Sequence, residues 1–491
     1  MYNGISFDRS ELGDIDVIKH DGIFHLFHLI LPNHDYIAHA VSENGFFWKR
    51  VKNAIFIGEP ESWDDDMLWT MHVSKHPTKK DLWRMFYTGI CRREKGRVQR
   101  IGMAVSNDLY KWEKRQDSSY PLSIPGPFYE SSVHEGRHWV SCRDPYYYSE
   151  KGKGYVLVNA RVPYGPMIRR GCVGIAQEIE LNRFEWLPPL FFPGAYDDIE
   201  VPVLYKAKNK YYLFGGIRED VKIHYWYSKS MFGPYRAFTD NVLMPQGNYA
   251  LRVTKHEDKL LAWNFFNTMD KDKITKTLPP PKEISIDSSG RIKLKSFSGF
   301  KLLEKKCFNM KSVFPIFSLL QNQYADFCNN NNTLSFISES GYEFFVFKQK
   351  LLNFKMNYNV KLVSSGKTGI LLRTDRNGNG YFISLDLKSG ITQARLWKES
   401  EDHLYERDYD YEVIQDSKFN PTSSKNYMVQ VIVCGTYYEL CINEKVILSY
   451  VDSSITYEGY FGFYVESSHI EVKNLRISEL ESIPKEFDAL V

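Results

Sequence analysis

The sequence predicts an all-β protein, a five-bladed β-propeller followed by a β-sandwich. Short runs of β-branched and aromatic residues, bounded by Gly, Asn, Asp or Lys, fill most of the chain and are typical of strands. A strand–turn–aromatic unit recurs in the first part of the chain. A proline-containing break at 277–300 then precedes a second set of strand-like runs. Sustained helical periodicity is almost absent.

Composition excludes several classes of partner. The 491 residues suffice for two or three domains with cores of their own. A net charge of +3 indicates no nucleic-acid partner, and no stretch is long enough to span a membrane. The sequence leaves the oligomeric state open.

The cysteines and the N-terminus bear on the compartment. The seven cysteines are scattered and form no C-x-x-C pair, which is typical of reduced thiols. The opening "MYNGISFDRSELGD" has no basic segment followed by an apolar run, so no signal peptide is visible. We therefore expect a cytoplasmic protein, or a secreted one if a leader has been trimmed.

The repeat is clearest in two segments. "HAVSENGFFWKRV" (39–51) and "MAVSNDLYKWEKR" (103–115) share A-V-S at the same offset from a tryptophan, and looser versions occur at 174–186 and 226–238. Each copy reads as a strand, a turn and an aromatic residue that opens the next strand. Such self-similarity favours a propeller, whose blades are four-stranded sheets.

Five strand starts predict five blades. They lie near Asp14, Trp69, Asp144, Glu200 and Asn248. In a propeller the innermost strands begin around one end of the central channel, so side chains from distant sequence positions converge there.

A second domain follows the break "TLPPPKEISIDSSGRIKLKSFSGF" (277–300). The later runs, joined by hairpin turns, resemble a concanavalin-type β-sandwich. We expect the propeller to span 1–295, a linker 296–325 and the sandwich 326–491. A structural support for the propeller is favoured over glycan binding as the role of the sandwich.

Three acids stand at the heads of expected inner strands: Asp14, Asp144 and Glu200. Carboxylates are costly to bury together unless they are paired or functional. Glycosidic bond cleavage needs two, one to protonate the leaving oxygen and one to attack or to activate water. Their shared placement in a repeat therefore favours a glycosidase site over three unrelated structural acids.

Around these acids the chain resembles glycoside hydrolase family 32, the invertase, inulinase and levanase group of a five-bladed propeller clan shared with family 43. "RDP" (143–145) is identical to the family's middle motif, and "IEVPVLYKAKNKYYLF" looks like its E-C-P segment. "GDIDVIKHDGIFHLFH" is similar to the N-D-P-N-G segment with the strand after it. "TLPPPKEISIDSSGRIKL" is similar to the T-L-P-R-E-L segment that closes the propeller.

The resemblance implies a retaining β-fructofuranosidase that acts on sucrose or fructans. It implies that Asp14 is the nucleophile and Glu200 the general acid and then base. Asp144 and Arg143 would bind neighbouring hydroxyls of the sugar, and Trp69 falls where the family places a substrate-contacting tryptophan. The implied partner is an oligosaccharide or polysaccharide substrate.

Departures from the family pattern keep two alternatives open. The first motif lacks its Trp, Asn and Pro, and its spacing is closer to family 43, whose arabinan and xylan enzymes invert configuration. A propeller that only binds carbohydrate is the other alternative. Asp16 is the rival of Asp14 for the first acid and a candidate substrate-binding residue, because strand alternation puts both on one face.

Other signals are weaker. The basic run "CRREKGR" (91–97) is typical of a solvated loop, and Arg218 with Glu219 of an exposed turn. "DRNGNGYFISLD" (375–386) partly matches a calcium loop, but its strand-like flanks favour a hairpin turn. No phosphate-binding loop, dinucleotide fingerprint or zinc spacing is present, so we expect neither a cofactor nor a metal.

Overall fold

The computed structural model describes residues 1–4, 11–122, 126–267, 276–309, 315–330, 332–364, 366–399 and 409–482. The chain divides into two compact units. One consists of Tyr2–Leu243 with Gly247–Ile292, and the other of Lys293–Ile483 with Met244–Gln246. Apart from two short 3-10 helices, η1 (Met167–Arg169) and η2 (Ser298–Leu303), the elements of the described chain are strands. The prediction of an all-β protein is confirmed.

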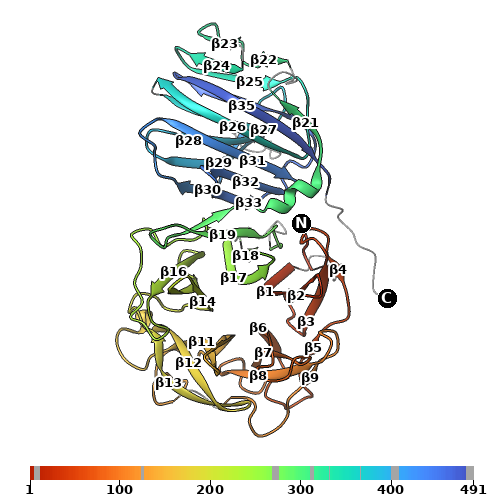
Figure 1. The fold of residues 1–491 in the computed structure, drawn as a ribbon, viewed down its shortest axis with the longest axis vertical. Coiled ribbons are helices and arrows are strands. Elements are labelled where there is room, and N and C mark those ends of the chain that lie inside the picture. The colour runs from red at the N-terminus through yellow and green to blue at the C-terminus, as the bar shows by residue number, and fades with distance from the viewer. Residues whose placement is uncertain are drawn as a thin grey trace. The chain divides into compact units, whose positions relative to one another are not determined.

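Five antiparallel sheets form the first unit, and each follows the chain outward strand by strand, except that the last strand of the first sheet pairs with the third (Figure 1). The first sheet holds β1 (Glu11–His20), β2 (Ile23–Leu31), β3 (Tyr36–Ser42), β4 (Lys49–Arg50) and β5 (Ile55–Phe56). The second holds β6 (Met67–Lys75), β7 (Trp83–Ile90), β8 (Gln99–Ser106) and β9 (Glu113–Lys114). The third holds β10 (Arg143–Glu150), β11 (Lys153–Arg161), β12 (Gly171–Glu180) and β13 (Arg183–Phe191).

The fourth sheet has three strands, β14 (Glu200–Ala207), β15 (Lys210–Ile217) and β16 (Lys222–Ser228). The fifth has β17 (Asn248–His256), β18 (Lys259–Phe266), β19 (Lys282–Ile286) and β20 (Ile292–Lys295). The first strands of the five sheets contact one another in chain order, and β17 returns to β1. This ring of inner strands confirms the five-bladed propeller.

Backbone hydrogen bonds close the ring between its first and last blades. The Leu12 N–H donates to the Lys276 carbonyl oxygen at 3.2 Å, and the Leu278 N–H donates to the Tyr2 carbonyl oxygen at 2.9 Å. Segments from the two ends of the propeller sequence are thereby joined, so the first strand is not left as an open edge.

The repeated A-V-S…W pattern has a structural role at two blade interfaces. The Ser42 and Ser106 hydroxyls each accept a backbone N–H three residues later, at 2.9 Å, and so hold the same turn. The tryptophans that follow pack against the preceding blade around the ring: Trp48 lies 5.8 Å from Trp263, and Trp112 lies 5.6 Å from Phe27. The repeat therefore encodes a turn and an inter-blade contact.

A β-bulge interrupts every inner strand near its start. The register shifts fall between Leu12 and Ile15, Trp69 and Met71, Arg143 and Tyr146, Glu200 and Val203, and Tyr249 and Arg252. A bulge breaks the alternation of side chains and re-aims the residues within it. Three of the bulges contain non-glycine residues with left-handed φ: Asp144 at 61°, Val201 at 49° and Ala250 at 54°. Such backbone is strained, most of all for a β-branched residue, and this strain is often found at functional sites.

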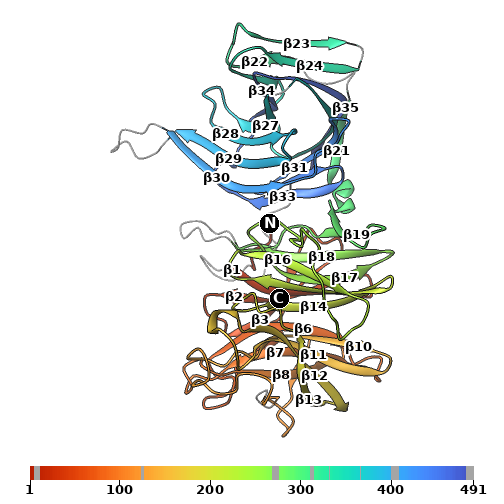
Figure 2. The ribbon, with the colours of Figure 1, turned by 90° about the vertical axis from the view of Figure 1, so that its left-hand side faces the viewer.

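The second unit is a β-sandwich of two sheets, as predicted, and Figure 2 shows the two layers. The eight-stranded sheet comprises β21 (Glu304–Asn309), β23 (Ala325–Asn330), β24 (Thr333–Ser338), β26 (Phe354–Ser364), β31 (Asn426–Cys434), β32 (Tyr437–Ile442), β33 (Lys445–Val451) and β35 (His469–Leu480). The seven-stranded sheet comprises β22 (Ile316–Ser318), β25 (Tyr342–Phe347), β27 (Lys367–Thr374), β28 (Gly380–Asp386), β29 (Ile391–Glu399), β30 (Tyr409–Lys418) and β34 (Tyr460–Glu466). A large cluster of buried apolar side chains, including Phe336, Phe461 and Val431, fills the space between the sheets.

The segment expected as a linker, 296–325, contains η2, β21 and β22. β21 pairs with β35 and β22 pairs with β25, so both strands extend the sheets of the sandwich.

The sequence 375–380 forms a tight turn between β27 and β28. One Asp375 carboxylate oxygen accepts the backbone N–H groups of Asn377 and Asn379, at 2.8 and 3.0 Å, and the other accepts the Asn379 side-chain amide. This is the hairpin turn that the flanking strands predicted.

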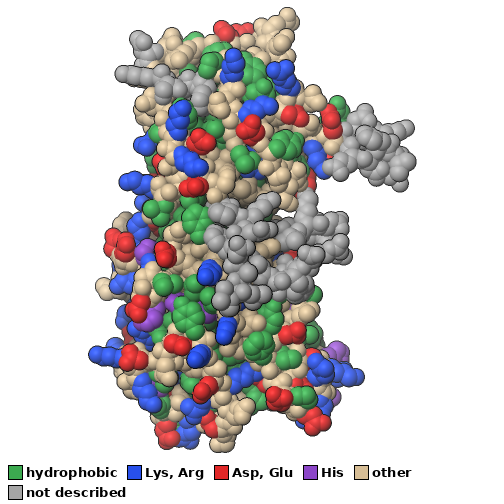
Figure 3. All heavy atoms as spheres, turned by 90° about the vertical axis from the view of Figure 1, so that its right-hand side faces the viewer, with side chains coloured by type: hydrophobic (Ala, Val, Ile, Leu, Met, Phe, Trp, Pro, Cys, Tyr) green, Lys and Arg blue, Asp and Glu red, His purple; other side chains and the backbone are tan. Residues whose placement is uncertain are grey.

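Within the part of the chain that the structure describes, no helix is long and apolar enough to cross a membrane. Acidic and basic side chains are interspersed among the described residues on the face that Figure 3 shows, in keeping with the small net charge.

Candidate active site

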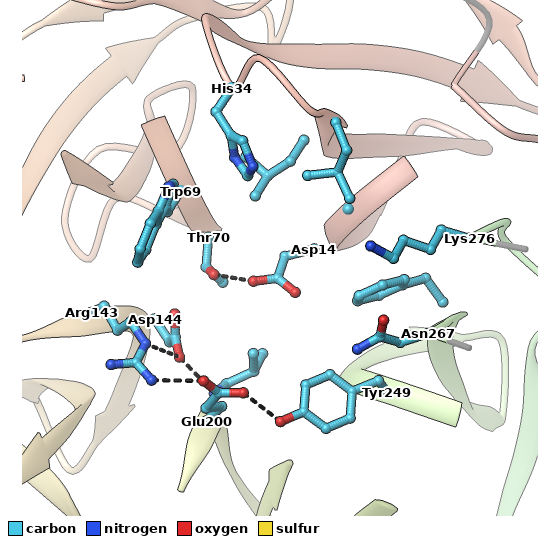
Figure 4. A pocket seen from close by; sticks show the side chains of 15 residues that line it. Asp14, His34, Trp69, Thr70, Arg143, Asp144, Glu200, Tyr249, Asn267 and Lys276 are labelled. Atoms are coloured by element: carbon cyan, nitrogen blue, oxygen red, sulfur yellow. Dashed lines mark hydrogen bonds and ion pairs between the residues drawn. The ribbon is translucent and has the colours of Figure 1, made fainter. Parts of the chain in front are cut away.

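A cavity of about 190 Å³ lies where the bulged starts of the inner strands converge, and Figure 4 shows it at close range. Four of the bulges contribute pairs of neighbouring residues and the fifth contributes Tyr249. The lining residues from the bulges are Gly13, Asp14, Trp69, Thr70, Arg143, Asp144, Glu200, Val201 and Tyr249. Leu29, Leu31, His34, Phe265, Asn267 and Lys276 complete the wall. The structure thus brings five of the six predicted site residues together.

Asp14 enters the cavity from the bulge of β1. The Thr70 hydroxyl of the next blade donates a hydrogen bond to its Oδ2. Burial, and then the neighbouring Asp144 carboxylate, raises the pKa of Asp14 to about 7 in spite of this hydrogen bond. The charge of Glu200 acts in the same direction. Asp14 is therefore poised to change protonation state near neutral pH.

Asp144 is fixed by a side chain of one neighbouring blade and the backbone of another. Its N–H donates to the Thr88 hydroxyl at 3.0 Å, and its Oδ2 accepts the N–H of Val201 at 3.1 Å. Burial raises the pKa of Asp144; the Arg143 guanidinium opposes this rise and the Glu200 carboxylate adds to it. The left-handed φ of both Asp144 and Val201 serves this contact between β10 and β14.

Glu200 is held by one donor on each side. Arg143 Nη2 donates to Glu200 Oε1 at 2.6 Å, and the Tyr249 hydroxyl donates to Oε2. Burial, with the nearby Glu200 carboxylate, raises the pKa of Tyr249 well above its ordinary value, so the phenol keeps the proton that it donates.

Arg143 is shared among several acceptors. Besides Glu200, its guanidinium lies 3.2 Å from Asp198 Oδ2 and 3.6 Å from Asp144 Oδ2, and it donates to Gln99 Oε1 at 3.3 Å. Asp198 is in turn bound by Arg137 at 2.9 Å. Burial alone would raise the pKa of Asp198, but Arg143 and Arg137 together hold it below its ordinary value. An ionised Asp198 therefore fixes the position of Arg143 from behind the cavity.

Trp69 and His34 each present a polar atom that lacks a partner in the described structure. The Trp69 indole Nε1 and the His34 Nδ1 are buried and accept or donate no hydrogen bond among these residues. Both side chains line the cavity, with ring centroids 6.3 Å apart. Unpaired buried polar atoms are costly, so a ligand with hydroxyl groups would satisfy them.

Asp16 does not reach the cavity. Its carboxylate is buried, accepts the Val73 N–H at 2.6 Å, and lies 3.4 Å from Arg252 Nε and 3.2 Å from His72 Nδ1. The expectation that Asp14 and Asp16 share a strand face rested on regular alternation. The bulge between Leu12 and Ile15 removes that alternation at Asp14.

Several site residues have no signal that sequence reasoning could use. Thr70 and Tyr249 bind the acids from neighbouring blades, Asp198 fixes Arg143, and His34, Asn267 and Lys276 line the wall. Thr70 directly follows the predicted Trp69, and Tyr249 directly follows the predicted strand start at Asn248. Their types belong to no catalytic motif, so only the packing of the blades identifies them.

This arrangement suits acid–base chemistry on a neutral, hydroxyl-rich ligand. Three carboxyl groups lie in one small cavity with a single guanidinium, and burial raises the pKa of two of them, Asp14 and Asp144. Among the described residues no cluster of His, Cys, Asp or Glu has the geometry to hold a metal ion.

Comparison with known proteins identifies the propeller. Residues 15–270 match the N-terminal domain of the glycosyl hydrolases of family 32, a match that begins one residue after Asp14. No curated protein matches significantly.

Solved structures match the fold over nearly the whole chain. An exo-inulinase from Aspergillus awamori has 14% identity and a TM-score of 0.68, over 98% of this chain and 98% of its own. A sucrose-6-phosphate hydrolase from Lactobacillus gasseri has 16% identity and a TM-score of 0.67, over 96% and 91%. A β-fructofuranosidase from Bombyx mori has 15% identity and a TM-score of 0.64, over 96% and 92%.

The family match spans more than half of the chain and carries two of the three acids, and the solved structures share the fold over both units. The chain belongs to the glycosyl hydrolases of family 32.

Proposed function

We propose that the protein is a retaining β-fructofuranosidase that hydrolyses sucrose or fructans. The observation that carries the proposal is the meeting of Asp14, Asp144 and Glu200 in one cavity, with Arg143 bridging two of them. The family match supports the reaction class. The names of the matched structures, an exo-inulinase, a sucrose-6-phosphate hydrolase and a β-fructofuranosidase, support a fructoside as substrate.

In this proposal the reaction has two steps. An Asp14 carboxylate oxygen attacks the anomeric carbon of the fructosyl unit, while Glu200 gives its proton to the departing glycosidic oxygen. Water then attacks the fructosyl ester, Glu200 takes back a proton from it, and the Asp14 carboxylate is released. Two displacements at one carbon give net retention.

The other polar groups position the sugar ring. One oxygen of Asp144 is engaged by the Val201 N–H. In the proposal Asp144 accepts hydrogen bonds from hydroxyl groups of the fructosyl unit, and its negative charge stabilises the positive charge that develops at the anomeric carbon of that unit. The free Trp69 Nε1 donates to a further hydroxyl, and Leu29, Leu31 and Phe265 give the ring an apolar wall.

The size of the cavity favours action at a chain end. About 190 Å³ is below the range of pockets for drug-sized ligands, roughly 300–1,000 Å³. The space suits one terminal sugar ring. We therefore propose exo action, with the fructosyl unit in this cavity.

One observation favours a second candidate, a propeller that binds carbohydrate without cleaving it. Glu200, the acid that must deliver a proton, is held at 2.6 Å by Arg143, and the Tyr249 hydroxyl donates to its other oxygen, so protein groups engage both oxygens. Against this, Arg143 is shared with Asp198 and Asp144, so its charge is not available to Glu200 alone.

Product analysis decides among these candidates. Purified protein is incubated with sucrose, inulin, levan and arabinan, and NMR identifies the released sugar and its first-formed anomer. β-Fructofuranose from sucrose or fructans supports the proposal, and a first-formed anomer of inverted configuration contradicts retention. No release from a folded protein that still binds these glycans would favour the binding protein.

Matched variants tie the activity to the cavity. Asp14→Asn should abolish fructose release, and Glu200→Gln should lower it about 10²–10⁴-fold. Asp21→Asn changes an exposed acid in the turn after β1 and should leave it unchanged, because that side chain is 85% exposed and outside the cavity.

A further inference from the structure

Arg137 is a nearly buried arginine that the proposed reaction does not use. It lies in the segment between β9 and β10, and its side chain is only 9% exposed. It is not among the described residues that line the catalytic cavity. A guanidinium is costly to bury unless its donors are paired, so the groups that it binds indicate its role.

The Arg137 guanidinium binds three side chains. Nη1 donates to Asp197 Oδ2 at 2.6 Å and to Asp198 Oδ2 at 2.9 Å. Nη2 donates to Asp198 Oδ1 at 3.1 Å and to Ser141 Oγ at 2.8 Å. The group also lies 4.1 Å from the centroid of the Trp139 ring. Asp198 is therefore held through both of its oxygens, a geometry that the planar guanidinium provides and a lysine ammonium does not.

Two of these acceptors are shared with Arg143. Arg143 Nη2 lies 3.2 Å from Asp198 Oδ2, and Arg143 Nη1 donates to Ser141 Oγ at 3.2 Å. Asp198 and Ser141 are each 1% exposed, so water does not compete for them. Both acceptors therefore join the two guanidinium groups. Arg143 in turn donates to Glu200 at 2.6 Å, a contact that Figure 4 shows.

The other side of Arg137 is connected to the third blade. Arg161, which lies on β11 and is fully buried, donates to Asp197 Oδ1 at 2.5 Å. Asp197 thus links Arg161 to Arg137. A continuous series of ion pairs therefore runs from a strand of the scaffold through Arg137 and Asp198 to Arg143.

We propose that Arg137 is a positioning residue for the reaction. Through Asp198 and Ser141 it holds Arg143 in the place from which Arg143 orients the Glu200 carboxyl group. The inference rests on the proposed function, in which Glu200 gives a proton to the leaving oxygen. Displacement of such a group by about 1 Å can lower a rate about a hundredfold.

Two substrates distinguish positioning from a purely structural role. In Arg137→Ala, kcat/KM for sucrose, whose leaving oxygen needs a proton, should fall about tenfold to a hundredfold. For β-fructosyl fluoride, whose leaving group needs none, kcat/KM reports only the formation of the fructosyl intermediate and should fall less than about threefold. An equal loss on both substrates, or no loss on either, would overturn the proposal.

Arg84→Ala is the matched control. Arg84 is also fully buried and ion-paired, with Glu178 at 2.8 Å, but lies outside the catalytic cavity. Its loss should lower the free energy of unfolding and keep the ratio of the two kcat/KM values at that of the wild type. A ratio that falls as far as in Arg137→Ala would show that any lost ion pair in the propeller has this effect.

Added guanidinium tests the role of the missing group directly. Millimolar guanidinium chloride, far below denaturing concentrations, should restore part of the sucrose activity of Arg137→Ala. Urea has the same shape but no charge and should restore less. Equal effects of the two compounds would contradict the proposal.

A double variant tests whether Arg137 acts through Asp198. If it does, Arg137→Ala combined with Asp198→Asn should lose no more sucrose activity than the more impaired single variant, because both changes release the same guanidinium. Losses that multiply would show independent effects and would contradict the proposed route.

A smaller change covers the case in which Arg137→Ala does not fold. Ser141→Ala removes one shared acceptor and no charge, and it should lower kcat/KM for sucrose, but not for the fluoride, by about threefold to tenfold. An unchanged value for sucrose would contradict the role given to Ser141.

Crystal structures separate this inference from the proposed function. If the wild type cleaves no fructoside, the proposed function fails, and the positions of Arg143 in the wild type and in the folded variant still test the inference. An Arg143 guanidinium that has left Glu200 in the variant supports positioning by Arg137. One that stays in contact with Glu200 overturns it.

Discussion

Arg143 donates to Glu200 at 2.6 Å and lies 3.2 Å from Asp198, so one guanidinium links the proposed proton donor to a buried acid outside the cavity. Asp198 is itself ion-paired with Arg137 at 2.9 Å. Asp198 therefore holds the Arg143 guanidinium in the position from which it donates to Glu200.

Asp198→Asn should lower kcat more than it changes the affinity for substrate. Without the Asp198 carboxylate, Arg143 loses the acceptor 3.2 Å from its Nη2 and is no longer fixed where it donates to Glu200. Initial rates with sucrose should show kcat lowered about tenfold to a hundredfold, with little change in KM. A kcat equal to that of the wild type would show that Asp198 serves only stability.

Activity should rise with pH through about 7 on the acidic side of the profile. Asp14 must be ionised to attack, and its pKa is raised to about 7 by burial and by the neighbouring carboxylates. The carboxylate form grows as pH rises, so kcat/KM should increase about tenfold per pH unit below this value and then level off. Initial rates at low sucrose concentration between pH 4.5 and 8 give this profile. A fall in kcat/KM through pH 7 would assign Asp14 to proton donation instead.

Glu200→Gln should spare substrates whose leaving group needs no proton. With sucrose the loss should be about 10²–10⁴-fold, the usual contribution of general acid catalysis, whereas β-fructosyl fluoride should still form the fructosyl intermediate. Added azide should then intercept that intermediate and yield a fructosyl azide of retained configuration. Asp14→Asn is the control, since it removes the nucleophile and should be inactive on both substrates.

Asp16→Asn should act on folding and Asp14→Asn on catalysis. Asp16 is buried against Arg252, and removal of one partner of a buried ion pair costs about 3–5 kcal/mol. Asp14 is raised in pKa, which means that its ionised form destabilises the folded state at neutral pH, so Asp14→Asn should be at least as stable as the wild type. Urea unfolding at pH 7.5 measures both. Equal unfolding free energies for the two variants would contradict the different roles given to these neighbours.

The propeller should lose stability as pH falls from about 6.5 toward 4. His25 and His39, hydrogen-bonded to each other at 3.1 Å, and His28 are buried, and burial lowers the pKa of His25 to about 4 and that of His28 to about 3. The unfolded chain then binds more protons than the folded one in this window. Each such histidine reduces the unfolding free energy by up to about 1.4 kcal/mol per pH unit until its folded pKa is reached.

Unfolding free energies at several pH values measure this slope. The pair variant His25→Gln with His39→Gln, compared with the wild type, should show a shallower fall. An unchanged slope would mean that these histidines are not the groups that take up protons on unfolding.

The sequence was sufficient for the blades and for the acids because both follow simple local rules. Asp144 stands in a run that matches a known motif, and Asp14 and Glu200 open apolar strands of the same repeat. Thr70, Tyr249 and Asp198 could not be found in this way, because each acts through a contact with another blade. Asp16 illustrates the reverse: its type and spacing suit a site, but the bulge at Gly13 and Asp14, which leaves no trace in the local sequence, turns Asp14 alone toward the cavity.

The five bulges have a consequence for engineering. Most of the side chains that face the cavity come from two-residue segments at the bulges, so the direction of each is set by main-chain geometry rather than by a choice of rotamer. The residues that follow each bulge on the inner strands do not line the cavity. Specificity can therefore be redesigned by exchanging these short cassettes, with the scaffold that carries them left intact.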